Sequence, residues 1–242
     1  MMHKRTLFCF LSIAIFAIAC NSDYTSKKKG YFDISLPNHT YQPFEKTDFP
    51  YDFEYPTYGK ISQDTTYFDV NPENKYWINV EFPDYNARLF LSYKKIGGNA
   101  LYKIKQADGT YKDSMGVNQF QLLVNDAFNL TNKNDVIASS IMDSAMVTPN
   151  NINGVFFTVG GNAATAHQFF LTDSTSNFIR GALYFDASPN ADSIRPVQEF
   201  LRKDIEHLIN TFKWKNANSI SIHRSCQETG ISCCFRNLTQ QR

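Results

Sequence analysis

Alternation of apolar and polar residues is clearest in the stretch "YWINVEFPDYNARLFLSY", residues 76–93. If residues 83–86 form the turn of a hairpin, the apolar residues of both strands fall on one face. The same register places Glu81 opposite Arg88 on the other face, a cross-strand pair of opposite charge. Because one register satisfies both faces, the pattern predicts an antiparallel hairpin. Its apolar pairs would be Phe82 with Ala87, Val80 with Leu89, Ile78 with Leu91, and Tyr76 with Tyr93.

Two other stretches repeat apolar residues at helical spacing. The first is "VNQFQLLVNDAFNL", residues 117–130, which predicts a mid-chain helix. The second is "RPVQEFLRKDIEHLINTFKW", residues 195–214, where Pro196 stands at a position that a first helical turn tolerates. It predicts a C-terminal amphipathic helix that lies across one face of a sheet. The apolar positions of this second stretch are Val197, Phe200, Leu201, Ile205, Leu208, Ile209 and Phe212.

The rest of the body reads as short strands and turns. Residues 31–68 are dense in Tyr, Phe and Pro, which favours short strands wrapped on a core. Residues 97–115 are polar and predict a loop or a small hairpin that turns at Asp108 and Gly109. Further strands are expected near residues 137–147, 155–159, 166–172 and 178–185. The order of strands, helix, strands and helix predicts an α+β domain built mainly on antiparallel sheet.

The N-terminus begins with Lys4 and Arg5 and continues as an apolar run that is shorter than the roughly 20 residues of a membrane-spanning helix. A positive start, a short apolar run and small residues before a cleavage point are typical of a secretory signal. The sequence "AIAC", residues 17–20, resembles a bacterial lipobox, in which the cysteine is lipidated and becomes the N-terminus. We therefore expect a signal peptide over residues 1–19 and lipid attachment at Cys20. Plain secretion is the alternative.

These features predict four consecutive parts. Residues 1–19 are the expected signal peptide, and residues 20–30 lack apolar periodicity, which predicts a flexible tether behind the lipidated cysteine. Residues 31–215 form the single expected α+β domain. Residues 216–242 have little apolar content and hold three of the five cysteines, so we expect a disordered tail and a core without disulfides.

Charge and side-chain chemistry exclude several function classes. The chain has 24 Lys+Arg and 23 Asp+Glu, a balance that shows no nucleic-acid footprint. The body histidines His39, His167 and His207 are too widely spaced for a zinc motif, so no metal or other cofactor is expected. The sequence contains no nucleophile elbow, phosphate loop or dinucleotide-binding glycine pattern. We therefore expect no catalytic residues and no enzyme activity.

Several segments resemble the GldD family of gliding-motility lipoproteins. They are "GYFDISLP", "YPTYGKI", "WINVEFPDYNARLFLSY", "GNAATAHQFFLTDSTSNFIRGALYFDASPNADSI" and "DIEHLINTFKW". The resemblance runs from the lipobox to about Lys215, and it is most specific between Gly161 and Phe185. Residues 97–115 look longer and more polar than the family pattern, and the tail after Lys215 has no counterpart in it.

The resemblance implies an envelope lipoprotein needed for gliding motility and type IX protein secretion, without catalytic residues. Its partners would be the membrane, through the N-terminal lipid, and other envelope proteins of gliding and secretion. Surface-directed lipoproteins of such bacteria tend to carry acidic residues after the cysteine. Here Asn21, Ser22 and Asp23 are followed by lysines, which favours a body facing the periplasm. Whether the anchor lies in the inner or the outer membrane stays open.

The most family-like segment supplies the candidate partner surface, which consists of Asn162, Thr172, Asp173, Ser174 and Arg180. A structural role for these residues, as turn formers and an ion-pair partner, is the alternative. A competing function is a ligand-binding module with an aromatic pocket under residues 31–67, for a lipid, glycan or peptide. Asp-Ser-apolar triplets also make Ser144 and Ser193 candidates for O-glycosylation.

Overall fold

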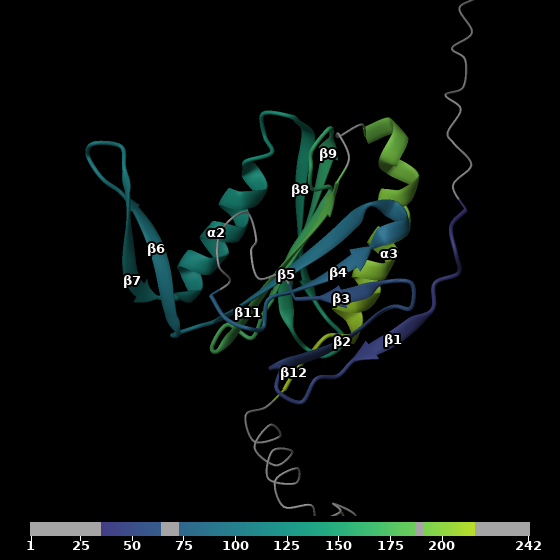
Figure 1. The fold of residues 1–242 in the computed structure, drawn as a ribbon, viewed down its shortest axis with the longest axis horizontal. Coiled ribbons are helices and arrows are strands. Elements are labelled where there is room, and N and C mark those ends of the chain that lie inside the picture. The colour runs from purple at the N-terminus through teal and green to yellow at the C-terminus, as the bar shows by residue number, and fades with distance from the viewer. Residues whose placement is uncertain (1–34, 64–72, 187–190, 216–242) are drawn as a thin grey trace, which may run out of the picture. The chain divides into compact units, whose positions relative to one another are not determined.

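A seven-stranded antiparallel sheet forms the centre of the fold (Figure 1). The structure is a computed structural model, and it describes residues 35–63, 73–186 and 191–215. Contacts divide the chain into Met1–Ser35 and Leu36–Arg242, and every element named below belongs to the second unit. In spatial order the strands are β3 (Lys60–Ser62), β4 (Ile78–Phe82), β5 (Ala87–Lys95), β11 (Asn177–Phe185), β10 (His167–Thr172), β9 (Asn153–Gly161) and β8 (Ala138–Val147).

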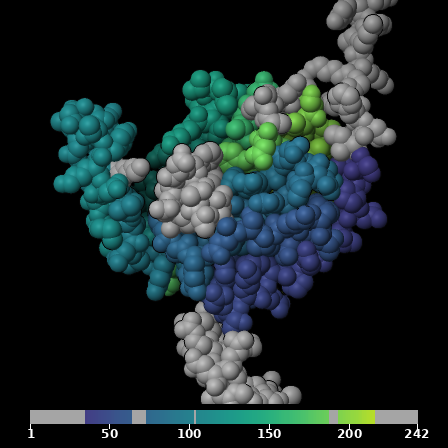
Figure 2. Space-filling view, in the orientation of Figure 1, coloured from purple at the N-terminus to yellow at the C-terminus, as the bar shows by residue number. Residues whose placement is uncertain are grey.

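Smaller elements surround this sheet. A three-stranded sheet has the order β1 (Tyr41–Phe44), β2 (Tyr51–Pro56) and β12 (Lys213–Trp214). A separate hairpin of β6 (Asn99–Lys105) and β7 (Tyr111–Val117) extends away from the main sheet (Figures 1 and 2). The helices are α2 (Phe120–Asn132) and α3 (Ala191–Thr211), with a short 3-10 turn, η1 (Pro83–Tyr85), between β4 and β5. This arrangement confirms the predicted α+β class.

The two α-helices cover opposite faces of the main sheet. Neighbouring residues of a strand point to opposite faces, so the side chains of Phe156 and Phe157 of β9 lie on opposite faces of the sheet. Phe157 packs with Leu123 of α2, whereas the guanidinium of Arg202 on α3 lies over the ring of Phe156 at 5.8 Å. Because it is covered on both sides, β10 is buried along its whole length.

The hairpin predicted from the alternating pattern is confirmed in its register. Phe82 pairs with Ala87, Val80 with Leu89 and Ile78 with Leu91, and Glu81 lies opposite Arg88. The Arg88 Nε lies 3.8 Å from the Glu81 Oε1. Tyr76 precedes β4, and its ring meets the ring of Tyr93 edge to face at 5.5 Å between centroids.

The predicted mid-chain helix is confirmed as α2, and the stretch at 97–115 forms the β6–β7 hairpin, with Gly109 at a positive φ of 85° in its turn. One expectation was wrong. Helix α3 begins at Ala191, so Pro196 lies inside the helix and not in its first turn. Pro196 cannot donate a backbone hydrogen bond within the helix. The buried apolar residues that follow it in α3 stabilise the helix despite that loss.

A close approach across the sheet explains one glycine of the family-like segment. Gly181 of β11 lies opposite Phe169 of β10. A Cβ built at Gly181 would lie 2.2 Å from the ring of Phe169, which is itself 1% exposed. A larger residue at this position would therefore displace a core aromatic side chain.

The aromatic segment before β4 contributes to the core. Phe44, Phe49, Tyr51 and Phe53 are all buried, and Phe212 at the end of α3 stacks with the last two of these rings. The expectation of short strands and turns wrapped on the core is confirmed for the described part of residues 31–68. These side chains therefore belong to the core, where they pack against one another and against Phe212.

His167 is buried on the α3 face of the sheet with 3% of its surface exposed. Neither ring nitrogen has a hydrogen-bond partner among the described residues. Burial, followed by the charge of Arg202, lowers the pKa of His167 from 6.5 to about 4. The unfolded chain therefore takes up a proton at a higher pH than the fold does, so stability is full above pH 6.5 and is lost as the pH falls toward 4.

Replacement of this histidine should flatten the acid limb of the stability profile. Between pH 7 and pH 5, we expect the wild-type chain to lose about 2 kcal/mol more unfolding free energy than His167→Phe, since one pKa unit corresponds to about 1.4 kcal/mol. Urea denaturation at the two pH values measures the difference. Equal losses in the two proteins would contradict a buried neutral histidine.

Candidate functional site

The five residues of the candidate partner surface do not form one patch. Asn162 follows β9 and lies beyond the His167 end of β10, whereas Asp173 and Ser174 follow the Thr172 end. A six-residue strand separates the two groups by about 17 Å. Arg180 lies between them on β11, opposite Phe170.

The carboxylate of Asp173 organises the turn between β10 and β11. It accepts hydrogen bonds from the backbone N–H groups of Thr175, Ser176 and Asn177 at 2.8–3.0 Å, and another from the Asn177 side chain. Burial alone would raise the pKa of Asp173, but these donors outweigh burial and hold the pKa below its ordinary value. Ser174 adopts a positive φ of 63° in the same turn. The Asp173 carboxylate therefore stabilises the conformation of this turn.

Arg180 belongs to a buried polar network on the α2 face. Its guanidinium donates to the side-chain oxygen of Gln168, which is 1% exposed. The same oxygen accepts from the hydroxyl of Thr131 on α2 at 3.2 Å, and the Gln168 amide donates to Thr165 at 2.8 Å. Arg180 is thereby fixed against the sheet.

The other sequence-predicted sites are spread over the chain. Ser144 is exposed on β8, and Ser193 is exposed near the start of α3. Glycosylation at these residues stays a prediction. Cys20, the expected signal peptide, the tether and the tail from residue 216 lie outside the described residues.

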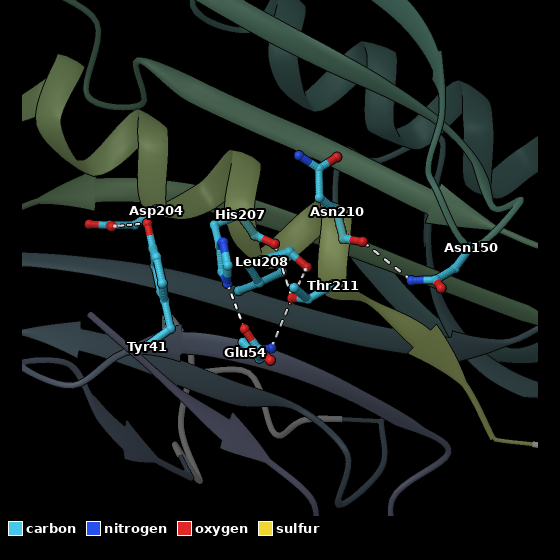
Figure 3. A network of polar contacts seen from close by, with 8 residues as sticks. All are labelled: Tyr41, Glu54, Asn150, Asp204, His207, Leu208, Asn210 and Thr211. Carbon is cyan, nitrogen blue, oxygen red and sulfur yellow. Dashed lines mark hydrogen bonds and ion pairs between the residues drawn. The ribbon is translucent and has the colours of Figure 1, made fainter. Parts of the chain in front are cut away.

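A buried carboxylate on α3 gathers side chains from the segment before β4. Asp204 is 1% exposed, and its Oδ1 accepts from the Nδ1–H of His39 at 2.7 Å and from the hydroxyl of Tyr41 at 3.1 Å. Its Oδ2 accepts from the hydroxyl of Tyr58. We call Asp204, His39, Tyr41 and Tyr58 the Asp204 cluster; Figure 3 shows its contact with Tyr41.

One turn further along α3, a second set of side chains contacts the three-stranded sheet (Figure 3). The ring of His207 stacks on Tyr41 at 3.5 Å between centroids, and its Nε2 lies 2.7 Å from the Glu54 Oε2. The backbone N–H of Glu54 donates to the Thr211 hydroxyl at 3.0 Å. The three-stranded sheet is therefore fastened to α3 by polar side chains as well as by aromatic packing.

The phenols of the Asp204 cluster remain donors well above neutral pH. Burial, then the charge of Asp204 and the hydrogen bond to it, raises the pKa of Tyr41 from 10.0 to about 12. Burial and the hydrogen bond to Asp204 raise the pKa of Tyr58 further. The cluster therefore keeps both phenolic protons throughout the physiological range.

An apolar cavity of about 470 Å³ lies between α2 and strands β4, β5 and β11. We call it the α2 groove. Leu123 and Leu130 line it from the helix, and Trp77, Phe90 and Phe178 line it from the sheet side. Arg180, a residue of the candidate partner surface, also lines it.

The cavities and the titratable clusters of the described residues lie in different places. His39 and Asp204 are hydrogen-bonded, but the Asp204 cluster lines neither the α2 groove nor two further cavities beside Asp173. The other two cavities, of about 620 and 320 Å³, both border Asp173. In the part of the chain that the structure describes, no cluster of His, Cys, Asp or Glu could hold a metal ion.

Sequence reasoning missed the Asp204 cluster and the α2 groove. A signal for the cluster was present, because Asp204 interrupts the apolar stripe of α3 between Leu201 and Ile205. A carboxylate in such a stripe needs buried donors. No comparable signal marked the groove, since its shape depends on how much of the sheet α2 covers.

No helix within residues 35–63, 73–186 and 191–215 has the length and hydropathy needed to span a bilayer. The class of protein emerges from the comparison with known families, which places the domain among gliding-motility lipoproteins of the cell envelope. The model of the family described as gliding motility lipoprotein GldD matches residues 21–214, and the chain belongs to that family. The resemblance stated from the sequence is therefore confirmed.

No curated protein matches the chain. Among solved structures, the chain is similar to the solution structure of cyanobacterial PsbP (CyanoP) from Synechocystis sp. PCC 6803. The sequence identity is 11%, the TM-score is 0.38, and the match covers 78% of this chain and 99% of the other. A likeness this weak carries no conclusion about function.

Loss of the buried carboxylate should loosen the N-terminal segment. We expect Asp204→Asn to lower the free energy of unfolding by about 2–4 kcal/mol. Hydrogen bonds to charged groups contribute about 1.5–3 kcal/mol each, and the NH2 group of asparagine would face one of the donors that the carboxylate now accepts from. Urea denaturation gives the value, and limited proteolysis should show faster cleavage before β2. Glu206→Gln, an exposed change on the same helix, is the control and should cost less than about 0.5 kcal/mol. Equal stability of the two variants would refute the fastening role.

Proposed function

We propose that this GldD-family lipoprotein supports gliding motility and type IX protein secretion by protein–protein contact, without catalysis. The family supplies the motility role and the association with the envelope. Lipid on Cys20 would confine the domain to a thin layer at the membrane, with the body facing the periplasm. Confinement raises the effective concentration of the domain for a partner in the same layer.

The observation that carries the contact proposal is the open edge of the main sheet. Strand β8 lies at one end of the strand order and has ten residues, whereas β3 at the other end has three. Soluble proteins usually protect long edges with charges, prolines, bulges or a covering segment. The sequence of β8, "ASSIMDSAMV", has one charged residue and no proline, and its pairing is irregular only between Ala138 and Ser140.

The side chains of β8 suit an apolar partner segment. Met142 is 59% exposed and Val147 is 64% exposed, although both lie in a regular strand. An extended segment of an envelope protein could add to this edge as an eighth strand, with backbone hydrogen bonds providing affinity and alternate side chains providing specificity. A glycan on Ser144 would project from the same strand, so glycosylation there and strand addition would compete.

The alternative function, a periplasmic module for a lipid, glycan or peptide, is supported by a different observation. Phe44, Phe49, Tyr51 and Phe53, from the segment expected to cover its pocket, are part of the core, whereas the α2 groove has the size and apolar lining of a ligand site. Binding of a small molecule and contact through β8 involve separate surfaces. They can therefore be tested separately.

A lysine in the middle of β8 should disrupt function without disrupting the fold. We expect Met142→Lys, introduced into the chromosomal copy, to reduce both colony spreading and the release of type IX cargo, because a charge on a strand edge disfavours strand addition. Val136→Lys is the matched control, since Val136 is 94% exposed just before β8 and the charge change is identical. Both proteins should accumulate and melt like the wild type. Normal spreading and secretion with Met142→Lys would rule out contact through this edge.

A further inference from the structure

The α2 groove exists because α2 covers only part of its face of the sheet. Leu123 and Ala127 pack on Phe157, Phe170 and Phe178, which lie on strands β9, β10 and β11. The same sheet face continues across β5 and β4 through Phe90 and Asn79, which pair in register. Helix α2 lies over β9, β10 and β11, so apolar surface of β5 and β4 remains uncovered beside the helix.

The size and lining of the groove are those of a ligand site. Protein interiors are normally packed without voids larger than a water molecule. A volume of about 470 Å³ falls within the roughly 300–1,000 Å³ of small-molecule sites. Most of the surface that faces the groove is apolar and comes from residues such as Trp77, Phe90, Leu123, Leu130 and Phe178. Asn79, Ser92 and four charged residues also line it. This chemistry suits a hydrocarbon chain better than a glycan, which would need many buried hydrogen-bond partners.

The charged residues around the groove differ between its two ends. At one end, Lys94 is paired with Glu73 at 2.6 Å, and Asp126 also lines the groove. Negative charge therefore balances or exceeds positive charge at this end.

Two basic residues, Arg180 and Lys133, line the other end. Arg180 is bound to Gln168, and Gln168 in turn contacts Thr131 in the last turn of α2. Lys133 follows two residues later, lines the groove, is exposed, and makes no ion pair with any described residue. Its ammonium group is available for a negatively charged ligand atom.

We propose that the α2 groove binds a single acyl chain with an anionic head group, as in a fatty acid. The hydrocarbon tail would lie between α2 and strands β4, β5 and β11, and the head group would meet Lys133. This site is separate from β8, so it goes beyond the contact function and stands without it. A membrane-anchored domain would also remain next to a source of such chains.

Photocrosslinking tests the proposal in the full-length protein. A diazirine-bearing fatty acid added to membranes that contain the protein should label peptides from α2 and from residues 77–94. Unlabelled saturated fatty acids should compete with the probe, and chains too long for a groove of about 470 Å³ should compete more weakly, because their excess methylenes do not fit between α2 and the sheet. The matching alcohols, which lack the charge, should compete at least tenfold more weakly.

Matched substitutions on one helix separate groove binding from contact with the bilayer. Leu130→Glu and Lys133→Glu should each reduce labelling at least tenfold. Leu122→Glu should not, because Leu122 is similarly exposed at 42%, against 39% for Leu130, but does not line the groove. If Leu130→Glu fails to accumulate, Lys133→Glu, a change at an exposed position, carries the test.

Three results would overturn the proposal. Equal labelling of the Leu130→Glu and Leu122→Glu proteins would mean that the probe reports only membrane proximity. Competition independent of chain length would exclude a groove filled by hydrocarbon. Equal competition by alcohols and acids, with normal labelling of Lys133→Glu, would exclude recognition of an anionic head group.

Discussion

The carboxylate of Asp204 lies inside the protein, where an unpaired charge would be strongly destabilising. It is tolerated because His39, Tyr41 and Tyr58 bring three donors to it from the segment that precedes β4. This requirement ties the first described part of the chain to the last helix. The three-stranded sheet is held on α3 in consequence, and α3 in turn covers one face of the main sheet.

That connection bears on the proposed lipid anchor at Cys20. In the described part of the chain, His39 and Tyr41 are the residues nearest the N-terminus that contact Asp204, so a force on the proposed anchor would reach β1 and the Asp204 cluster first. Tyr41 takes part twice, through its hydroxyl to Asp204 and through its ring to His207. Strand β1 is therefore held by polar and aromatic contacts together. The α2 groove and the β8 edge, which carry the two binding proposals, are formed by other elements.

The sequence predicted local structure well wherever a periodic pattern was complete. The register from Ile78 to Leu91 followed from two faces that had to be satisfied together, and α2 followed from helical spacing. The start of α3 was missed because Pro196 was taken to mark a first turn. The contacts of Asp204 join residues more than 140 positions apart, and periodicity contains no information on such pairs. The α2 groove depends on where a helix rests on a sheet, which is also a tertiary property.

We propose that this domain works in gliding and secretion from a lipid anchor on Cys20. An in-frame deletion, complemented with wild type or with Cys20→Ala, should be scored for colony spreading and for release of type IX cargo. We expect wild type to restore both activities and Cys20→Ala to restore neither, although its protein accumulates. Normal spreading and secretion in the deletion strain, or full rescue by Cys20→Ala, would contradict it.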